Sequence, residues 1–371
     1  HFNYSLPKDF WPIFQNIEHD QQSIEDFQSS SYMALIRNFK RFGWLVLYLF
    51  GSSPAFSKSF DSLVDNGMRE YDKDTLYQPY GTSLRMSDLG YTSKVQASIN
   101  ISVNNLEDYI NNLREAITTT ESSYADLGLL ADGNYQQLSL SKLQIENEYY
   151  SPVRPKRVAL SGERPTAALS RGGVEYIEIR SLDLNVFDPV GINQNTLRFM
   201  ESFLIYCLLE DSPEMTTNED KENMTNHTAT ANYGRSPNFM LQQDGKKISL
   251  KSWSLMLMDN ILQVAEMIDR NNNCSDYKKS VQAQIELIQD ASATPSARFI
   301  QELHETKLDF AEYGLSLAEK QKNYFADLMP LNSKKSKLFR DEATTSKLKQ
   351  AEIESVDQPP LNLYLKDYFK S

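Results

Sequence analysis

The chain has 371 residues and a formal net charge of −12, from 38 Lys and Arg against 50 Asp and Glu. Hydrophobic residues make up 40% and aromatic residues 11%, enough for a packed core, which excludes wholesale disorder. The acidic balance excludes a nucleic-acid binder that tracks phosphates, because that binding needs a basic face. The longest apolar run, residues 44–50, is far shorter than the roughly 20 residues that cross a bilayer. We therefore expect a soluble globular protein with no membrane or nucleic-acid partner.

The first seven residues alternate in polarity, as in a strand closed by Pro7. His1 and Asn3 would share one face, and Phe2 and Tyr4 the other. The chain starts with His1 instead of Met, without a charged-then-apolar signal segment. We expect that an N-terminal segment of the protein is absent from this sequence.

Cysteine is scarce. Cys207 and Cys274 are too few for a disulfide framework or a four-thiolate zinc site. Cys207 lies in an apolar run, which favours a buried, inert thiol. This usage favours a reducing, cytoplasmic location.

The first half of the chain predicts a mixture of helices and strands. Residues 28–50 have a mainly helical pattern, and residues 51–80 are irregular. Residues 104–117 predict an amphipathic helix capped by Asn104. Its apolar stripe consists of Leu106, Tyr109, Ile110, Leu113 and Ile117.

Two further segments, 143–150 and 174–180, alternate like strands with one apolar and one polar face. In the second, Ile177 and Ile179 share one face, and Glu178 and Arg180 share the other. The polar face of the first would carry Gln144, Glu146, Glu148 and Tyr150. An antiparallel sheet with one packed face and one polar face gives this pattern, so the residues alone predict an α+β protein.

After Pro189 the pattern becomes helical, and a polar stretch at 211–230 reads as a solvated loop. The expected helices cover about 194–210, 252–270, 276–290 and 296–328. The charged end of the chain predicts a loose helix and a surface strap. We divide the chain into a sheet-containing core (1–192), a helical region packed on it (193–330) and a charged tail (331–371).

Glu178 and Arg180 are the first candidates for chemistry, because residues two apart on a strand share a face about 6.5 Å apart. The carboxylate could hold Mg²⁺, while the guanidinium could bind carboxylate or phosphoryl oxygens beside it. The alternative is an ion pair on a solvated face. His1 could be a metal ligand or a structural histidine.

Arg85 and the basic run at 154–157 could likewise have either a binding role or a structural role. Arg85, with Tyr91 close by, suits a small carboxylate, although an arginine that staples a loop fits equally well. The basic run at 154–157 is too short for nucleic acid, but one of its members could face a phosphate. Glycine-rich phosphate loops and a serine-hydrolase elbow are absent from the sequence, so metal and side chains would have to hold any nucleotide phosphates.

In order along the chain, several stretches resemble the proteobacterial type of glutamate–cysteine ligase, also called γ-glutamylcysteine synthetase. The matching stretches are residues 1–7, 39–44, 48–54, 80–91, 144–157, 171–183, 189–191 and 212–215. The resemblance is close over about 1–215 and loose beyond.

The resemblance implies an α+β fold similar to glutamine synthetase, with an antiparallel sheet curved into a funnel and helices outside. It also implies that ATP phosphorylates the γ-carboxylate of L-glutamate and that L-cysteine then attacks the γ-glutamyl phosphate. This would be the first step of glutathione biosynthesis, with Mg²⁺ or Mn²⁺ neutralising the charge between the reactants. We expect a monomer whose partners are these small molecules.

Residue by residue, the resemblance implies that Glu178 and His1 are metal ligands. Arg180 would be the catalytic arginine that meets the glutamyl and phosphoryl oxygens. The substrate-binding pocket for cysteine would contain Arg85, Tyr91 and Tyr150. It implies no defined role for Glu146 or Glu148.

This sequence departs from the family's pattern at the N-terminus. There the family has a long segment that supplies further acidic metal ligands and part of the sheet. We therefore expect that residues 1–371 alone cannot catalyse the ligation. Two alternatives to the ligase stay open at this point. One is a non-catalytic relative that binds a small amino acid or a partner protein, and the other is a ligase with a different amine acceptor.

Overall fold

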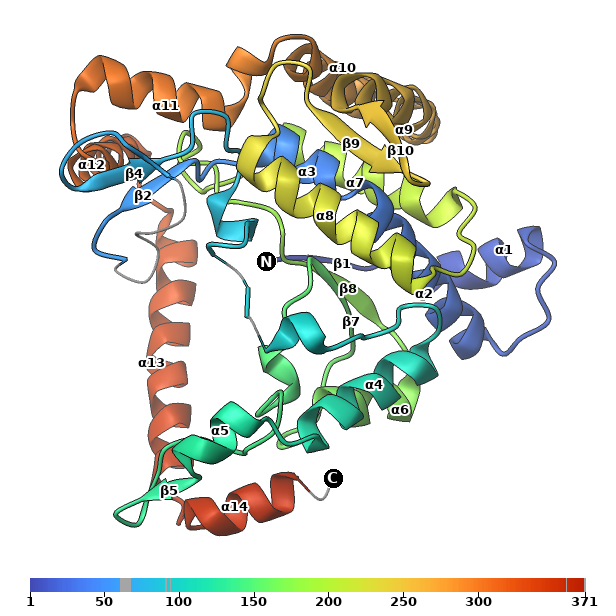
Figure 1. The fold of residues 1–371 in the computed structure, drawn as a ribbon, viewed down its shortest axis with the longest axis vertical. Coiled ribbons are helices and arrows are strands. Elements are labelled where there is room, and N and C mark those ends of the chain that lie inside the picture. Colours follow the sequence, from blue (N-terminus) through green and yellow to red (C-terminus); the bar gives the residue numbers. More distant parts are fainter. Residues whose placement is uncertain (61–67, 91, 94, 358, 370–371) are drawn as a thin grey trace. The chain divides into compact units, whose positions relative to one another are not determined.

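The computed structural model describes residues 1–60, 68–90, 92–93, 95–357 and 359–369 (Figure 1). This part of the chain combines many helices with small antiparallel sheets, and it divides into two compact units, His1–Gly314 and Leu315–Ser371. The helices are α1 (Phe10–Ile17), α2 (Ile24–Phe42), α3 (Trp44–Phe50), α4 (Leu106–Thr118), α5 (Ser122–Leu127), α6 (Pro165–Gly172), α7 (Gln194–Leu209), α8 (Thr217–Tyr233), α9 (Leu250–Asn272), α10 (Asp276–Gln289), α11 (Pro295–Thr306), α12 (Phe310–Asp327), α13 (Ser333–Ser355) and α14 (Leu361–Tyr368). The strands are β1 (Phe2–Tyr4), β2 (Ala55–Ser57), β3 (Arg69–Glu70), β4 (Thr75–Tyr77), β5 (Leu130–Ala131), β6 (Asn134–Tyr135), β7 (Val153–Lys156), β8 (Tyr176–Ile179), β9 (Met240–Gln243) and β10 (Lys246–Ser249).

The sheet that matters for function has the order β1-β8-β7, with all neighbours antiparallel. In its register, Glu178 on the central strand faces Asn3 on one side and Arg154 on the other. Side chains directly opposite each other in a sheet point to the same face. The three residues therefore share the polar face, and the predicted antiparallel sheet with one packed and one polar face is confirmed here.

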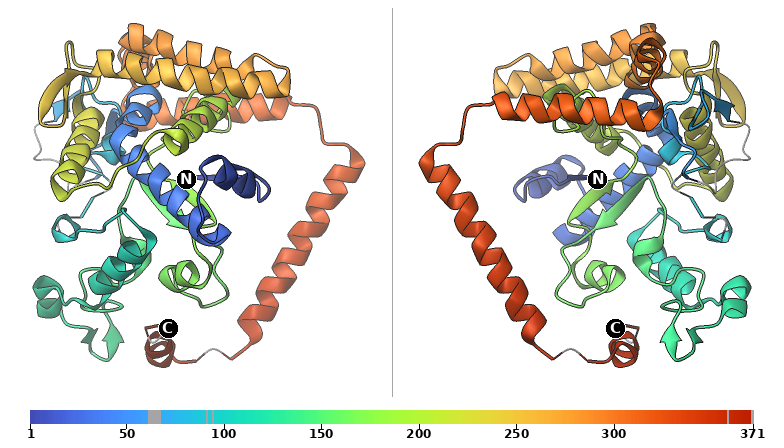
Figure 2. Two further views of the ribbon diagram at one scale, coloured as in Figure 1. Left: turned by 90° about the vertical axis from the view of Figure 1, so that its right-hand side faces the viewer. Right: turned by 90° about the vertical axis from the view of Figure 1, so that its left-hand side faces the viewer.

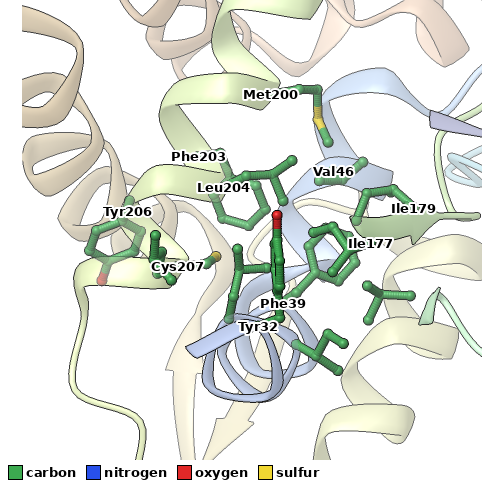
Figure 3. Packing of buried hydrophobic residues seen from close by; sticks show 14 of the residues in the cluster. Tyr32, Phe39, Val46, Ile177, Ile179, Met200, Phe203, Leu204, Tyr206 and Cys207 are labelled. Atoms are coloured by element: carbon green, nitrogen blue, oxygen red, sulfur yellow. The ribbon is translucent and has the colours of Figure 1, made fainter. Parts of the chain in front are cut away.

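The packed face of this sheet rests on the hydrophobic core (Figure 3). Ile177 and Ile179 are fully buried, and they meet apolar side chains of α2, such as Phe39, and of α7, such as Phe203. Burying a side chain of this size contributes about 1.5–3 kcal/mol. The core thus fixes the strand, and through it the direction of Glu178 on the opposite face.

The amphipathic helix predicted at 104–117 is present as α4, and its apolar stripe is buried except for Leu106, which is half-buried. The predicted cap is wrong by one residue. The Asn105 side chain accepts the N–H of Asp108 (2.8 Å), whereas the Asn104 side chain exchanges hydrogen bonds with the backbone of Met215 (2.7 and 3.1 Å). A long-range contact has therefore taken Asn104 away from the helix end.

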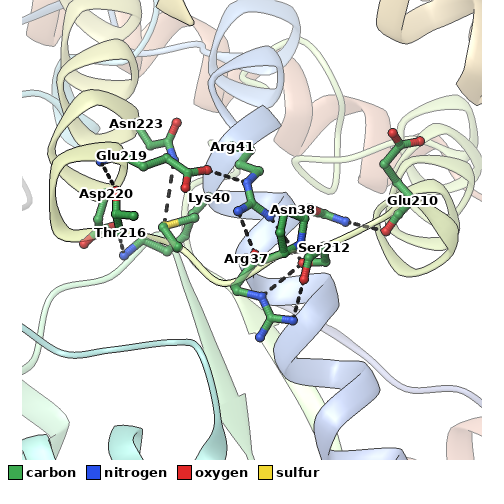
Figure 4. A network of polar contacts seen from close by, with 12 residues as sticks. Arg37, Asn38, Lys40, Arg41, Glu210, Ser212, Thr216, Glu219, Asp220 and Asn223 are labelled. Atoms are coloured by element: carbon green, nitrogen blue, oxygen red, sulfur yellow. Dashed lines mark hydrogen bonds and ion pairs between the residues drawn. The ribbon is translucent and has the colours of Figure 1, made fainter. Parts of the chain in front are cut away.

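The loop predicted at 211–230 is wrong, because most of it forms α8. Thr216 caps this helix by accepting the N–H of Glu219 (3.2 Å), and two acids lie in its first turn, where the helix dipole favours them. Both acids pair with cations of α2: Glu219 with Arg41 (2.6 Å) and Asp220 with Lys40 (Figure 4). The helix packs through polar contacts, so a search for an apolar stripe misses it.

The same network ties α2 to the segment between α7 and α8. Arg37 donates to the hydroxyl (3.1 Å) and the carbonyl (2.9 Å) oxygens of Ser212 (Figure 4). Arg41 donates to the carbonyl oxygen of Pro213 (2.8 Å). The stretch at 212–215, one of those that resemble the family, is therefore held in place by buried or half-buried arginines of α2.

The strand predicted at 143–150 is also wrong. Residues Glu146–Glu148 form a 3-10 helix, and the strand of this region is β7, which starts at Val153. Glu146 is buried because its carboxylate accepts the backbone N–H (2.7 Å) and the hydroxyl (2.6 Å) of Thr166, in the first turn of α6. Because this polar side chain is buried by its hydrogen bonds, the segment does not have the alternation of buried apolar and outward polar side chains that predicts a strand.

Two predicted helices are each divided in the structure. The helix at 28–50 is split at Gly43 into α2 and α3, and the helix at 296–328 is split into α11 and α12. Lys307, between the latter two, adopts the left-handed conformation (φ 55°), which ends α11. The segment predicted to be irregular, 51–80, carries the short sheet β2-β4-β3.

Three helices, α7, α9 and α10, follow the predictions closely, whereas α1, α5 and α6 were not predicted. α9 and α10 lie side by side as an antiparallel pair (Figure 2), near the predicted 252–270 and 276–290. In the second unit, α13 and α14 lie on either side of the Pro359-Pro360 break. Among the described residues, no helix combines the length and the apolar character needed to cross a membrane. The division at 192 and 330 stays a prediction.

Candidate active site

Glu178 is the centre of a charged cluster on the polar face of the β1-β8-β7 sheet. It is 9% exposed. Its Oε1 lies 3.0 Å from Nδ1 of His1, and its Oε2 lies 3.0 Å from Nη1 of Arg180 and 3.5 Å from Nζ of Lys156. The structure therefore brings three predicted site residues, His1, Glu178 and Arg180, into one cluster and adds Lys156.

Strand geometry explains this convergence. Tyr176, Glu178 and Arg180 alternate with the buried Ile177 and Ile179, so they point away from the core. The sheet continues at Arg180, whose N–H donates to the carbonyl oxygen of Pro152 (2.8 Å). His1 directly precedes β1, which places it beside the end of β8.

The cluster is cationic although the chain as a whole is acidic. Arg154, Lys156 and Arg180 surround the single carboxylate of Glu178 on this face. The pKa of Lys156 is lowered, chiefly because burial removes water from its ammonium group and then because Arg154 and Arg180 repel it, while Glu178 acts in the opposite direction. Excess positive charge on a partly buried face attracts anions, and a nucleotide phosphate or a substrate carboxylate would supply them.

The cluster offers two ligand atoms for a metal ion, one oxygen of Glu178 and one nitrogen of His1. In the described part of the chain, no group of three His, Cys, Asp or Glu side chains could hold a metal on its own. Mg²⁺ is commonly bound by one or two carboxylates together with substrate phosphates, so a single protein carboxylate fits that mode. Imidazole is the less usual ligand for it. Glu178 with His1 could thus provide the protein's share of a metal site.

Arg85 lies at the end of β8, held by several acceptors. Its Nε donates to Oδ1 of Asp183 (2.8 Å), and its Nη2 donates to the carbonyl oxygens of Arg180 (3.0 Å) and Leu182 (3.2 Å). Asp183 in turn accepts the N–H of Ser52 (2.9 Å). Arg85 therefore staples its loop, as one of the two sequence-based readings expected, while 39% of its side chain stays exposed beside the cluster. Its role in substrate binding stays a prediction.

Tyr150 lies at the wall of a cavity of about 740 Å³, which is lined by residues of α8 and by residues 86–88, 92–93 and 96–101. It is 37% exposed, and its N–H donates to Oε1 of Gln96 (2.8 Å). Met86 and Ser87, which follow Arg85 directly, line the same cavity. The structure thus brings the neighbours of Arg85 near Tyr150. Tyr91 lies outside the described residues.

His227 is a cavity residue that the sequence did not reveal. It lines the same cavity, is buried, and its Nε2 has no hydrogen-bond partner among the described residues. Burial first, and then the charges of Arg85 and Lys40, lower its pKa to about 4. The imidazole is therefore neutral at pH 7. The sequence did not point to this residue, because it is a single histidine in a segment that was predicted to be a solvated loop.

The two acids without a predicted role have structural contacts. Glu146 binds the first turn of α6 and pairs with Nε of Arg164 (3.0 Å). Glu148 accepts the N–H of Gln144 (2.7 Å). Neither of these contacts involves the cluster at Glu178.

Comparisons with known proteins point to one family. The protein family described as "Glutamate-cysteine ligase" matches residues 1–230. The chain is 40% identical over 368 residues to the glutamate–cysteine ligase of Pseudomonas fluorescens (strain Pf0-1), covering 99% of this chain and 69% of that protein. It is 41% identical over 374 residues to the glutamate–cysteine ligase of Alcanivorax borkumensis, covering 100% of this chain and 71% of the relative.

Two solved structures are similar to this chain. The glutamate–cysteine ligase of Francisella tularensis, in complex with AMP, superposes with a TM-score of 0.89 at 34% identity, over 99% of this chain and 71% of that one. A bifunctional glutathione synthetase from Pasteurella multocida superposes with a TM-score of 0.62 at 21% identity, over 87% of this chain and 36% of that one, and this likeness concerns the fold alone.

Proposed function

The chain belongs to the glutamate–cysteine ligase family, and we propose that it joins L-cysteine to the γ-carboxylate of L-glutamate with conversion of ATP to ADP and phosphate. The product, γ-glutamylcysteine, is the first intermediate of glutathione biosynthesis. Similarity to ligases of this name over nearly the whole chain supports the activity. The observation that carries it to particular residues is the cationic cluster around Glu178, within one of the stretches, 171–183, that resemble the family.

The reaction needs ATP because a carboxylate is a poor acyl donor. Its oxygen becomes a good leaving group only when it carries a phosphoryl group. In the proposed mechanism, an oxygen of the glutamate γ-carboxylate attacks the terminal phosphorus of ATP, ADP leaves, and a γ-glutamyl phosphate forms. The amine of cysteine then attacks the carbonyl carbon of the γ-glutamyl phosphate, the C–O bond to phosphate breaks, and the amine loses a proton as phosphate leaves. Both steps gather negative charge, which positioned cations stabilise.

Within this proposal, Arg180 is the catalytic cation. It is held at Glu178 Oε2 and by the sheet, so its guanidinium is oriented before substrate binds. A planar guanidinium can bind two oxygens of a carboxylate or phosphoryl group at once. Glu178 and His1 would hold Mg²⁺ or Mn²⁺, and such an ion, when bound, would neutralise phosphate charge. The ammonium and guanidinium groups around Glu178 would repel a cation unless phosphates come with it, so metal and nucleotide should bind together.

We assign the acceptor pocket to Arg85, Tyr150 and Tyr91. The position of Arg85 at the end of β8 supports this assignment, because a carboxylate that met its exposed side would lie close to Arg180. The neighbouring cavity, with Tyr150 in its wall, has room for a small amino acid. An adjacent acceptor is what attack on the γ-glutamyl phosphate requires.

Three finer points belong to the same proposal. The β1-β8-β7 sheet would be part of a curved, funnel-like sheet similar to that of glutamine synthetase. The protein would be a monomer. It would act in the cytoplasm, which the two free cysteines, Cys207 and Cys274, support.

The test is ADP release by the gene product that contains this chain, measured with glutamate alone, with cysteine, and with 2-aminobutyrate as the acceptor. Dependence on both glutamate and cysteine supports the ligase. A strong preference for 2-aminobutyrate or another amine would identify a different acceptor. Nucleotide binding without any amino-acid-dependent turnover would point to a non-catalytic relative.

A further inference from the structure

No residue of the basic run Arg154-Pro-Lys-Arg157 has been given an individual role so far, and the cations of this run have different surroundings. Nη2 of Arg154 donates to the carbonyl oxygen of Asn147 (3.2 Å). Nη1 of Arg157 donates to the carbonyl oxygen of Gly172. Both arginines therefore hold backbone segments in place. Lys156 differs, because the contact that its ammonium group makes is with Glu178 at the centre of the candidate active site.

The position of Lys156 follows from the register of the sheet. It lies two residues after Arg154 on β7, so both side chains belong to the polar face. Its side chain is 21% exposed, and its Nζ lies 3.5 Å from the Glu178 oxygen that Arg180 contacts at 3.0 Å. Since both nitrogens contact one oxygen, the two cations cannot be farther apart than the sum of these two distances.

Three cations lie close to one another around the carboxylate of Glu178. Glu178 carries one negative charge, while Lys156 and Arg180 each carry a positive charge against the same oxygen, and Arg154 stands beside them in the register. A partly buried cation is stable when an anion or several acceptors meet it. A second anion with several oxygens, bound next to Glu178, would complete the arrangement.

We propose that Lys156 contacts the terminal phosphate of ATP and stays with that phosphoryl group as it moves to the γ-carboxylate of glutamate. This inference rests on the proposed function and deepens it. An ammonium group has three N–H donors on a flexible stem, so one can face Glu178 while others meet phosphate oxygens. Arg180 approaches the same oxygen of Glu178, so the phosphoryl group would lie between two fixed cations. Phosphoryl transfer is accelerated mainly by such positioned charge.

The competing explanation is that Lys156 only neutralises Glu178 and never meets a substrate. Three variants separate the two: Lys156→Met removes the charge, Lys156→Arg keeps it, and Arg157→Met removes the neighbouring cation of the same run. The first measurement is the KM for ATP and kcat in the coupled ADP assay. The second is the affinity for a non-hydrolysable ATP analogue and for AMP by calorimetry, which needs no turnover.

For Lys156→Met we expect kcat/KM for ATP to fall about a hundredfold and affinity for the ATP analogue to fall about tenfold, with AMP binding unchanged. Lys156→Arg should recover part of the analogue affinity. Arg157→Met should leave both nucleotide affinities and the KM for ATP at parent values, with a lower melting temperature. Equal losses for AMP and the ATP analogue in Lys156→Met would overturn the assignment to the terminal phosphate.

A double-mutant cycle with Glu178→Gln tests the competing explanation directly. If Lys156 meets phosphate, Lys156→Met must still weaken binding of the ATP analogue when Glu178 is already neutral. If it weakens binding only while Glu178 is charged, Lys156 acts through Glu178 and the proposal is overturned. A parent protein without glutamate-dependent ADP release would contradict the proposed function instead, so the two failures are distinguishable.

Discussion

Lowering the pH from 7 to 5 should destabilise this protein by about 2 kcal/mol through His227 alone. Burial, Arg85 and Lys40 lower the pKa of this imidazole from 6.5 to about 4. In the unfolded chain it takes up a proton as the pH falls through 6.5, whereas in the folded protein it stays neutral until about pH 4. Between about pH 6.5 and pH 4 the unfolded state therefore binds more protons than the folded state, so the free energy of unfolding decreases as the pH is lowered. Below pH 4 the loss reaches roughly 3 kcal/mol, from about 1.36 kcal/mol per pKa unit.

The assay is the free energy of unfolding in urea at pH 7, 6 and 5 for the parent and for His227→Gln, which cannot be protonated. Tryptophan fluorescence can follow unfolding, because Trp44 and Trp253 are buried and their rings are 4.9 Å apart. The difference between parent and variant should change by about 2 kcal/mol between pH 7 and pH 5. His304→Gln, at an exposed position, controls for the loss of an imidazole as such. A pH-independent difference, or an imidazole NMR signal of His227 that titrates near 6.5, would refute the reasoning.

Three further predictions concern the candidate active site and its support. Glu178→Gln should lower kcat at least about a hundredfold at saturating Mg²⁺, about 2.7 kcal/mol, and activity within about threefold of the parent would remove Glu178 from the metal site. Arg85→Ala and Tyr150→Phe should each raise the KM for cysteine more than the KM for ATP, and equal effects on both would exclude them from the acceptor pocket. Ile177→Ala, which removes a fully buried side chain beneath Glu178, should lower the free energy of unfolding by about 2–5 kcal/mol, while Tyr176→Ala, at a half-buried position on the polar face, should lower it less.

The sequence was most informative where apolar periodicity decides the structure. The alternation around Ile177 and Ile179 identified a strand with a buried face, and the spacing of Tyr109, Ile110 and Leu113 identified α4, because in both cases packing against the core is the main driving force. The family resemblance then gave the activity, which no periodicity could give.

The errors lie where polar contacts override periodicity. α8 is polar on nearly every side and is stable because its side chains bond across to other elements. Asn226, for example, exchanges hydrogen bonds with the backbone of Gln242 (2.7 and 2.9 Å). The alternation predicts Glu146 on the polar face of a strand, but its side chain is buried and bonds to Thr166. Contacts between residues far apart in the sequence decide these segments, and a local pattern does not contain them.

The candidate site shows the same limit. Spacing put Glu178 and Arg180 on one face, but only the antiparallel register brings Lys156 and His1 to the same carboxylate. Likewise, the sequence allows Arg85 either to bind a substrate carboxylate or to hold its own loop in place. The contact with Asp183 shows that it staples its loop, and substrate binding at its exposed side remains to be tested.

The central claim is that the carboxylate of Glu178 and the guanidinium of Arg180 form the phosphoryl-transfer site of a glutamate–cysteine ligase. The most direct measurement is formation of γ-glutamylcysteine from glutamate, cysteine, ATP and Mg²⁺ by the gene product that contains this chain, beside its Glu178→Gln and Arg180→Met variants. The account predicts product and stoichiometric ADP from the parent, and a loss of about a hundredfold or more in each variant, with their melting temperatures close to that of the parent. Parent-like product formation by either folded variant would contradict it.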